Sequence, residues 1–261
     1  MNNLRVFFAG GLTSYRALFN WLNPWAFLSI LIAYPVFQTM YFVYLGRAAD
    51  TANDTFFLVG NAFVAASVAG MFGMGQSIGG ERRYQTLPTL LASPASRLAL
   101  FLGRALPAIV NGFVVATLSY TLAALMIHLH IPAGRLAGIA VALLASCFAC
   151  AGLGLCIGSL AFRTRSISLF ADTLSGVFLI ITGANVPLAR LPNGLQVLAN
   201  YIPLTHGIRA ARALAAGGTF DHALSAIGKE ALIGVVYFTI GVAMLRYFER
   251  SARRAGSLDR F

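Results

Sequence analysis

The sequence predicts an all-α membrane protein with six transmembrane helices. The 261 residues are 58% hydrophobic and 10% charged, with a mean hydropathy of +0.76, whereas soluble domains carry about 25% charged residues. The apolar residues also collect in runs close to the roughly 20 residues that cross a bilayer core. We therefore expect residues 1–261 to form a single transmembrane domain in contact with membrane lipids.

The first element expected is a helix over residues 1–23 that lies in the membrane interface. Arg5 and Arg16 alternate there with apolar and aromatic side chains, which suits a helix with its arginines toward the lipid headgroups. Gly10 and Gly11 leave a frayed N-terminus as the alternative.

Six apolar runs follow, and the basic residues between them indicate the orientation. The runs lie near residues 25–44, 55–79, 104–127, 136–162, 167–186 and 231–248. Of the 19 basic residues, 13 fall on one side of this arrangement and the other 6 on the opposite side. This asymmetry follows the positive-inside rule and places both termini in the cytoplasm. The net charge of +11 thus reflects topology and does not indicate a nucleic-acid partner.

Residues 80–104, between the second and third runs, form a charged segment too short to be a domain. Leu87, Leu90 and Leu91 fall at i, i+3 and i+4, which is one face of a short helix, and Pro94 closes the pattern. We expect a small amphipathic helix on the cytoplasmic surface that passes force or a signal to a docked partner.

Residues 188–230, after the fifth run, differ from an ordinary loop. They are apolar enough to enter the outer leaflet, but Pro192, Gly194 and Pro203 prevent a continuous span. Irregular backbone at membrane depth is stable only where protein or water covers it. We expect a re-entrant pair of short helices, with a solvent-exposed loop as the alternative.

No residue pattern in the chain indicates catalysis, a metal or a cofactor. A phosphate-binding loop needs G-x-x-x-x-G-K-[ST], and the sequence around the single lysine, Lys229, lacks that spacing. The histidines form no cluster with ligand spacing. Cys147 and Cys150 are expected to act as small hydrophobic residues in a packed helix rather than as a redox or metal pair. Energy for any transport must therefore come from an ion gradient or from another polypeptide.

Asp172 is the one carboxylate that the predicted boundaries place inside a span. Its role is open between a functional one and capping or pairing with Arg163 or Arg165. Ion-coupled carriers normally show more ionisable groups within their spans, so the sequence disfavours that class.

Two further patterns concern helix packing. Aromatic side chains on one face of the first span are expected to pack against neighbouring helices more often than against substrate, and they are Tyr34, Phe37, Tyr41 and Tyr44. Glycines four residues apart, which allow close approach of helices, occur at Gly75 and Gly79 and at Gly154 and Gly158.

Two segments together carry a family resemblance. The first comprises Glu81-Arg82-Arg83-Tyr84-Gln85-Thr86-Leu87, Leu91-Ala92-Ser93-Pro94-Ala95-Ser96-Arg97 and Leu102-Gly103-Arg104; the second comprises Gly183, Pro187, Leu191-Pro192, Tyr201-Ile202-Pro203-Leu204-Thr205 and Arg212-Ala213-Leu214. With six spans between cytoplasmic ends, the chain resembles the type-2 ABC transporter permeases, the membrane subunits of many bacterial exporters. It departs from their pattern at Gln85, Pro88 and Arg104.

The resemblance implies a set of partners and site residues. A second permease chain, identical or paralogous, would pair with this one, and two separate ATPase subunits that bind ATP and Mg²⁺ would dock beneath them. The ATPase-coupling residues would be Glu81, Arg82, Arg83, Thr86, Leu87, Leu90 and Leu91. The substrate path would open between the second and fifth spans of the two chains, with Phe72, Met74, Phe170 and Phe178 as candidate lining residues.

The function expected is export of a hydrophobic or amphiphilic compound, such as a drug or antibiotic, across a bacterial inner membrane. This expectation uses the resemblance together with apolar spans that offer no dense charge for a polar cargo. Export of a lipid-linked glycan or lipid is the alternative within the class. An ion-coupled secondary transporter, and a membrane scaffold or sensor, are the alternatives from other classes.

Overall fold

The computed structural model describes residues 28–83, 97–129, 132–160 and 167–254, and every regular element in those ranges is helical. The elements in chain order are η1 (Leu28–Ala33), α3 (Tyr34–Ala48), α4 (Asp54–Arg83), α6 (Arg97–Met126), α7 (Ala133–Ser159), α8 (Ile167–Ile181), η3 (Leu188–Arg190), α9 (Asn193–Ala199), α10 (Thr205–Ala215) and α11 (Phe220–Arg254). The predicted all-α class is confirmed for these parts of the chain.

Four of the described helices are long and apolar enough to cross a bilayer, namely α4, α6, α7 and α11. Their apolar spans hold between 22 and 29 residues, which matches or exceeds the roughly 20 that a hydrocarbon core requires. Residues 169–181 of α8 form a shorter apolar helix. The protein is therefore a multi-pass membrane protein.

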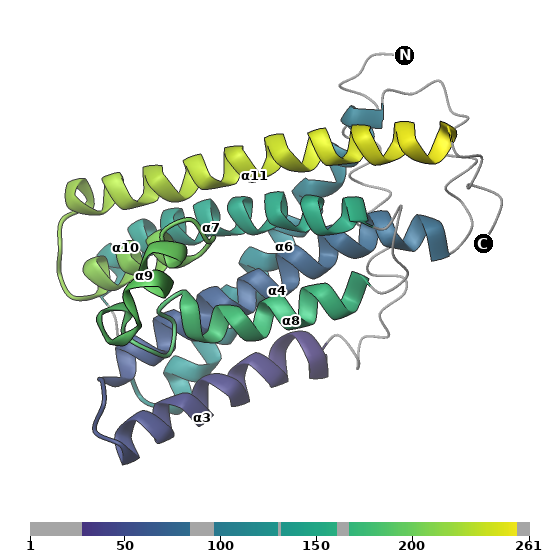
Figure 1. Ribbon diagram of the computed structural model, residues 1–261. Coiled ribbons are helices and arrows are strands. Elements are labelled where there is room, and N and C mark those ends of the chain that lie inside the picture. Colours follow the sequence, from purple (N-terminus) through teal and green to yellow (C-terminus); the bar gives the residue numbers. More distant parts are fainter. Residues whose placement is uncertain (1–27, 84–96, 130–131, 161–166, 255–261) are drawn as a thin grey trace.

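The long helices run along one common direction, and α9 and α10 gather at one end of them, which we call the α10 end (Figure 1). Helix α4 lies at the centre and packs against α3, α6, α7, α8 and α10. Its apolar span is 83% buried within the chain, whereas that of α11 is 17% buried. Helix α4 thus forms the core, and α11 presents most of its surface to the surroundings.

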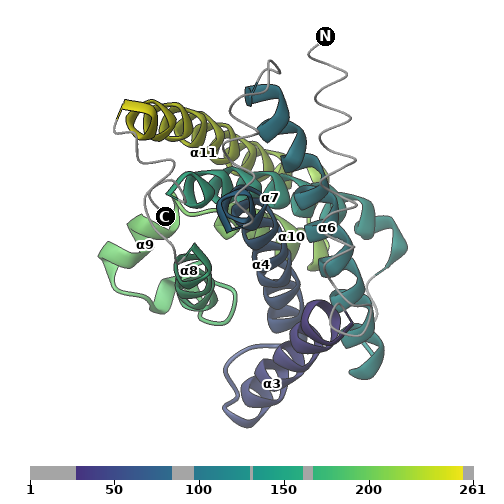
Figure 2. The ribbon, with the colours of Figure 1, turned by 90° about the vertical axis from the view of Figure 1, so that its right-hand side faces the viewer.

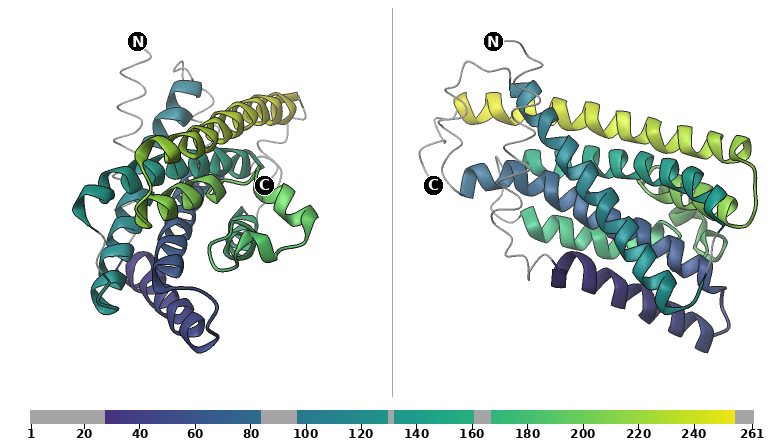
Figure 3. Two further views of the ribbon diagram at one scale, coloured as in Figure 1. Left: turned by 90° about the vertical axis from the view of Figure 1, so that its left-hand side faces the viewer. Right: turned by 180° about the vertical axis from the view of Figure 1, so that it is seen from behind.

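Two helices flank α4 on opposite sides. Helix α8 lies beside α4 on the side away from α6 (Figure 2). Helix α6 crosses α4 obliquely, as the view from behind shows (Figure 3). Because α8 makes its main packing contact with α4 alone, much of its surface faces away from the chain.

Glycines on α7 allow its close contact with α4. A Cβ added at Gly154 would lie 2.9 Å from the carbonyl oxygen of Met71, and one at Gly158 would lie 2.8 Å from the side chain of Ile78. At Gly154 the neighbour is backbone, so only glycine permits this spacing between the helices, whereas at Gly158 the end of the Ile78 side chain would have to move. The packing role expected for Gly154 and Gly158 is confirmed.

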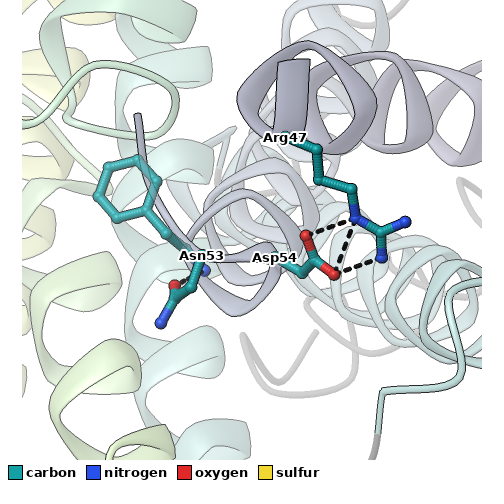
Figure 4. Close-up of polar contacts among 4 residues, drawn as sticks. Arg47, Asn53 and Asp54 are labelled. Atoms are coloured by element: carbon teal, nitrogen blue, oxygen red, sulfur yellow. Dashed lines mark hydrogen bonds and ion pairs between the residues drawn. The ribbon is translucent and has the colours of Figure 1, made fainter. Parts of the chain in front are cut away.

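The turn between α3 and α4 is closed by polar side chains (Figure 4). Asn53 caps α4, since its Oδ1 accepts the Phe56 amide N–H at 3.0 Å. Asp54 begins α4 and pairs with Arg47, whose Nε donates to Oδ1 at 3.0 Å. A carboxylate at a helix N-terminus is favoured by the helix dipole, although an exposed pair of this kind contributes little stability.

Three helix ends differ from the sequence prediction. Helix α4 continues through Arg83 and α6 begins at Arg97, so both helices extend into the segment predicted over 80–104. Helix α11 begins at Phe220, so the segment predicted over 188–230 ends earlier than expected. The charged residues in these stretches suggest that the membrane spans end there. A helix can nevertheless continue through charged residues, either because they lie near its end or because buried groups bind them.

Candidate functional site

Three of the seven predicted coupling residues are described, and they lie at the end of the bundle opposite the α10 end. Glu81, Arg82 and Arg83 form the last turn of α4, and α6 starts at Arg97 at the same end of the bundle (Figure 1). Thr86, Leu87, Leu90 and Leu91 lie outside the described residues, as does the interfacial helix predicted over 1–23. The described ends of α4 and α6 thus lie at the end of the bundle opposite α9 and α10.

The four predicted path residues fall into two pairs. Met74 and Phe178 are fully buried and belong to the same hydrophobic core within one chain. Phe72 on α4 and Phe170 on α8 are exposed, and Phe72 is the one large hydrophobic residue of α4 that reaches the surface among the described residues. Within a single chain, therefore, Phe72 and Phe170 are available to a substrate, whereas Met74 and Phe178 support the core.

The aromatic face of α3 is exposed in the described part of the chain, so the described helices do not supply the packing partners expected from the sequence. Its members are each more than half exposed, and they are Tyr34, Phe37, Tyr41 and Tyr44. The opposite face of α3, with Val36, Thr39 and Val43, is the buried one. The hydrophobic pattern alone did not distinguish the two faces, because both are apolar.

Asp172 and the cysteines have different environments. Asp172 is exposed on α8, and Arg163 and Arg165 lie outside the described residues. Cys147, Cys150 and Cys156 are free thiols buried in α7. In the described part of the chain, no group of three histidine, cysteine or acidic residues has the arrangement of a metal site.

The buried amide of Asn61 and the partly buried amides of Gln38 and Asn185 connect α3, α4 and the turn after α8. The Nε2 of Gln38 donates to Asn61 Oδ1 at 3.2 Å, and Asn61 Nδ2 donates to Asn185 Oδ1 at 2.7 Å. Asn61 Nδ2 also donates to the Phe57 carbonyl at 2.9 Å, and Asn185 Nδ2 donates to the Leu179 carbonyl at 3.3 Å. Each amide thereby gains partners that a hydrocarbon environment would not supply.

Arg212 of α10 makes a second connection at the α10 end. Its guanidinium donates to the carbonyl oxygens of Gly183 at 2.7 Å, Ala184 at 2.8 Å and Phe56 at 2.8 Å. The same group stacks on the Phe56 ring, with Cζ 3.4 Å from the ring centroid. Burial lowers the pKa of Arg212 to about 9, which leaves the group charged at neutral pH. Arg212 thus joins α10 to the first turn of α4 and to the end of α8.

Glu230 of α11 makes the third connection, and its side chain is fully buried. Oε1 accepts the Leu204 amide N–H at 2.6 Å, and Oε2 accepts those of His206 and Gly207, each at 3.1 Å. These N–H groups belong to the beginning of α10, where the helix dipole also favours a negative charge. The carboxylate therefore binds α10 to α11 without an ion pair in the described part of the chain.

The joint between α9 and α10 is strained and tightly packed. Leu204 has φ +83° and ψ −32°, a conformation that non-glycine residues rarely adopt. The His206 ring donates from Nε2 to the Asn200 carbonyl at 3.0 Å, because a carbonyl oxygen can only accept. Burial is the main cause that lowers the pKa of His206, and the charges of Arg209 and Lys229 lower it further. The neutral ring is thus favoured.

Sequence reasoning missed Glu230 and Arg212 as connecting residues. It placed Glu230 at the end of the outer segment and regarded Asp172 as the sole carboxylate within a span, which is wrong because Glu230 lies inside the apolar span of α11. A signal was present, since the buried positions Ala223 and Ile227 continue to Glu230 and Gly234 at i, i+4, i+7 and i+11. Arg212 belongs to the segments that carry the family resemblance, but the sequence does not indicate its connecting role, because its partners are backbone carbonyls of distant segments.

Comparison with known proteins identifies the family of the chain. No curated protein matches the chain. The family model described as "ABC-2 type transporter" matches residues 12–215, which is most of the chain. That range includes α3, α4, α6, α7, α8, α9 and α10. The chain therefore belongs to the ABC-2 type transporter family and is an ABC transporter membrane subunit.

Proposed function

We propose that this chain is the permease of an ATP-driven exporter that moves a hydrophobic or amphiphilic compound, with drug or antibiotic efflux favoured. The exposed aromatic surface of α3 and α8 carries this proposal. Phe37, Tyr41 and Phe170 are each at least half exposed, and none of them belongs to the core of the chain. Aromatic side chains offer large apolar surfaces with a few polar groups, which suits cargo of this kind.

In this proposal the chain does not itself bind or hydrolyse ATP. Separate ATPase subunits bind ATP and Mg²⁺ and dock at the end of the bundle where α4 ends and α6 begins. Glu81, Arg82 and Arg83, with Thr86, Leu87, Leu90 and Leu91, form the contact with the ATPase. Support comes from the family, whose permeases work with ABC ATPase subunits, and from the position of Glu81–Arg83 at the end of the central helix.

A second permease chain, identical or paralogous, completes the passage. Within one chain α8 packs mainly on α4, and its outward side chains, including Leu169 and Ile180, are apolar and exposed. A second copy facing α3 and α8 would cover this surface and enclose Phe72 and Phe170. Both termini lie in the cytoplasm of a bacterial cell in this proposal, and the α10 end faces outward.

Export of a lipid-linked glycan or lipid is the second candidate. The hydroxyl groups of Tyr34, Tyr41 and Tyr44 favour it, because aromatic rings with polar tips suit sugar-bearing cargo. An ion-coupled carrier is disfavoured. The carboxylate of Glu230 is occupied by three backbone N–H groups, and Asp172 stands alone on α8 among the described residues.

The test is the double substitution Glu81→Ala and Arg82→Ala in the complex purified with its ATPase from native membranes. We expect the permease to remain in the membrane at normal abundance while its stimulation of ATP hydrolysis is lost, because the contact that transmits force is gone. Arg250→Ala, on the exposed part of α11 at the same end of the bundle, is the matched control and should keep stimulation. Unchanged stimulation in the double variant would contradict the coupling role.

A further inference from the structure

We propose that α10 is the fixed part of the outer segment, that η3 and α9 are its movable part, and that residues 200–203, which end at the anchored Leu204, are the joint between them. Glu230 and Arg212 are the positioning residues that hold α10 on the bundle. The inference rests on the proposed exporter function, because it states which element opens the transport passage at the α10 end. The geometry that carries it is present in the single chain.

Glu230 makes α10 and α11 one body. A buried carboxylate without compensating groups costs several kcal/mol, and here the compensation comes from the amides of Leu204, His206 and Gly207. Any rotation of α10 relative to α11 would leave the carboxylate unpaired. Helix α10 also packs closely on α7, because a Cβ at Gly207 would overlap the Ser146 hydroxyl. A displacement of α10 alone is therefore strongly unfavourable.

Arg212 fixes the other end of α10. It lies seven residues after Thr205, about 10 Å along the helix at 1.5 Å per residue. Its three carbonyl partners belong to α4 and to the turn after α8. Those carbonyls would lose buried hydrogen bonds if α10 moved away. The two charged side chains thus hold α10 at both ends, to different helices, and α10 braces α11 against α4 and α8.

Helix α9 lacks such attachments in the described part of the chain. Val197, Leu198 and Tyr201 are about half exposed or more, and Ala199 is the buried residue of the helix. Its polar contacts with neighbours are two, from His206 to the Asn200 carbonyl and from the Tyr237 hydroxyl to the Tyr201 carbonyl at 3.3 Å. Both lie at its C-terminal end, next to the joint. Helix α9 also packs on α8, but its polar attachments to neighbours lie at its C-terminal end, so in this proposal it swings about that end.

Leu204 marks the fixed end of the joint. A non-glycine residue rarely adopts its conformation, so the surroundings must impose it. Here the Leu204 side chain is fully buried and its N–H is held by Glu230. Because the Leu204 N–H, its side chain and the residues after it are fixed, a displacement of α9 must be taken up by rotation in residues 200–203, between the end of α9 and Leu204.

Distance measurements between paired spin labels test the inference in the full chain, in nanodiscs and in complex with its ATPase. The native cysteines are first removed by Cys147→Ala, Cys150→Ala and Cys156→Ala. One pair, Arg209→Cys with Lys229→Cys, reports on α10 against α11. The other, Val197→Cys with Arg209→Cys, reports on α9 against α10. All three labelled positions are exposed.

We expect the 209–229 distance to stay the same between the ATP-trapped and nucleotide-free states, while the 197–209 distance changes. A change in the 209–229 distance, or an unchanged 197–209 distance while other parts of the complex respond to ATP, would overturn the inference. If ATP changes no distance anywhere in the complex, the exporter proposal fails. Hydrogen exchange then shows whether α10 is fixed and α9 is movable.

Hydrogen exchange needs no partner. In the wild-type chain we expect the amides of Leu204, His206 and Gly207 to exchange at least tenfold more slowly than those of Val197 and Leu198. Equal rates would overturn the inference even if export were demonstrated.

Substitution of Glu230 tests its positioning role. Glu230→Gln keeps the shape of the side chain but replaces one acceptor oxygen with an NH₂ donor, so at least one backbone N–H loses its partner. We expect at least tenfold faster exchange at the beginning of α10 and a broadened 209–229 distance in this variant. Lys229→Gln, at the exposed neighbouring position, should match the wild type. Wild-type exchange in Glu230→Gln would contradict the role, and if this variant fails to fold, the wild-type measurements remain decisive.

Discussion

Asn61 shows how a single buried amide joins three parts of a membrane protein. It lies on the central helix α4, receives a hydrogen bond from Gln38 of α3, and donates one to Asn185 after α8. Water is absent from the bilayer core, so a side-chain amide there needs protein partners. The unfolded chain within the membrane also finds partners, however, so each such bond contributes a modest amount of stability.

A double-mutant cycle on Asn61 and Asn185 measures that contribution. We expect Asn61→Ala to lower the free energy of unfolding by about 1–3 kcal/mol, because it leaves buried partners unsatisfied. The coupling between the two asparagines should be about 0.6 kcal/mol and at most about 1.7 kcal/mol. The measurement is reversible unfolding in mixed micelles. Asn200→Ala on the exposed face of α9 is the control, and a coupling near zero would show that the 2.7 Å contact contributes nothing.

At the scale of elements, the contact between α4 and α7 depends on small residues in α7. Gly154 faces the Met71 backbone of α4 so closely that a methyl group has no room. Because backbone atoms cannot rotate away, an added side chain must separate the helices. This differs from an exposed glycine such as Gly228 of α11, where a Cβ would meet no atom within 4 Å.

Gly154→Ala and Gly228→Ala should therefore change stability in opposite directions. We expect Gly154→Ala to destabilise the fold by about 1–3 kcal/mol, the usual cost of overpacking a core. Gly228→Ala should be neutral or stabilising by up to about 1 kcal/mol, because alanine has the higher helix propensity. Thermal unfolding of the two variants side by side measures the difference. Equal unfolding temperatures would mean that α4 and α7 are not in contact as described.

The sequence predicted the helices well where the apolar runs were long. The runs that became α4, α6, α7 and α11 are long enough to cross a bilayer, and an apolar run of that length is typical of a transmembrane helix. The ends of the helices were predicted less well. Lys229 and Glu230 suggest the start of the last membrane span, but both lie inside α11. From sequence alone, a charged residue inside a helix looks the same as one at the helix end. The two cases are distinguished only when the partners of the charged residue are known.

The connecting residues could not be predicted for a related reason. Glu230 and Arg212 bind backbone groups of segments 23 or more residues away along the chain. Backbone N–H and carbonyl groups are the same in every residue, so the sequence contains no partner to find. The proline and glycine pattern predicted a re-entrant pair of short helices after the fifth run; α9 and α10 are two short helices in that stretch, and their re-entrant position in the membrane stays a prediction.

At the scale of the whole molecule, the two ends of the bundle differ in kind. The α10 end is closed by short helices and buried hydrogen bonds, whereas at the opposite end α4 and α6 terminate around residues 84–96 (Figure 1). Six of the 19 basic residues belong to the α10 end by the sequence prediction, and 13 to the other. The positive-inside rule then predicts that the α10 end lies outside the cell.

Cysteine labelling of intact cells tests this orientation in the chain lacking native cysteines. We expect Thr219→Cys, in the exposed turn before α11, to react with a membrane-impermeant maleimide in intact cells. Ser93→Cys, in the predicted coupling segment, should react only after the cells are permeabilised, because a partner that hydrolyses ATP must reach it from the cytoplasm. Thr51→Cys, between α3 and α4, is a second outer position and should behave like Thr219→Cys. The reverse pattern would place the ATPase-coupling segment outside the cell and remove the basis for ATP-driven transport through residues 81–91. The hydrogen bonds of Glu230 and Arg212 would then still hold α10 in place, but at the cytoplasmic face.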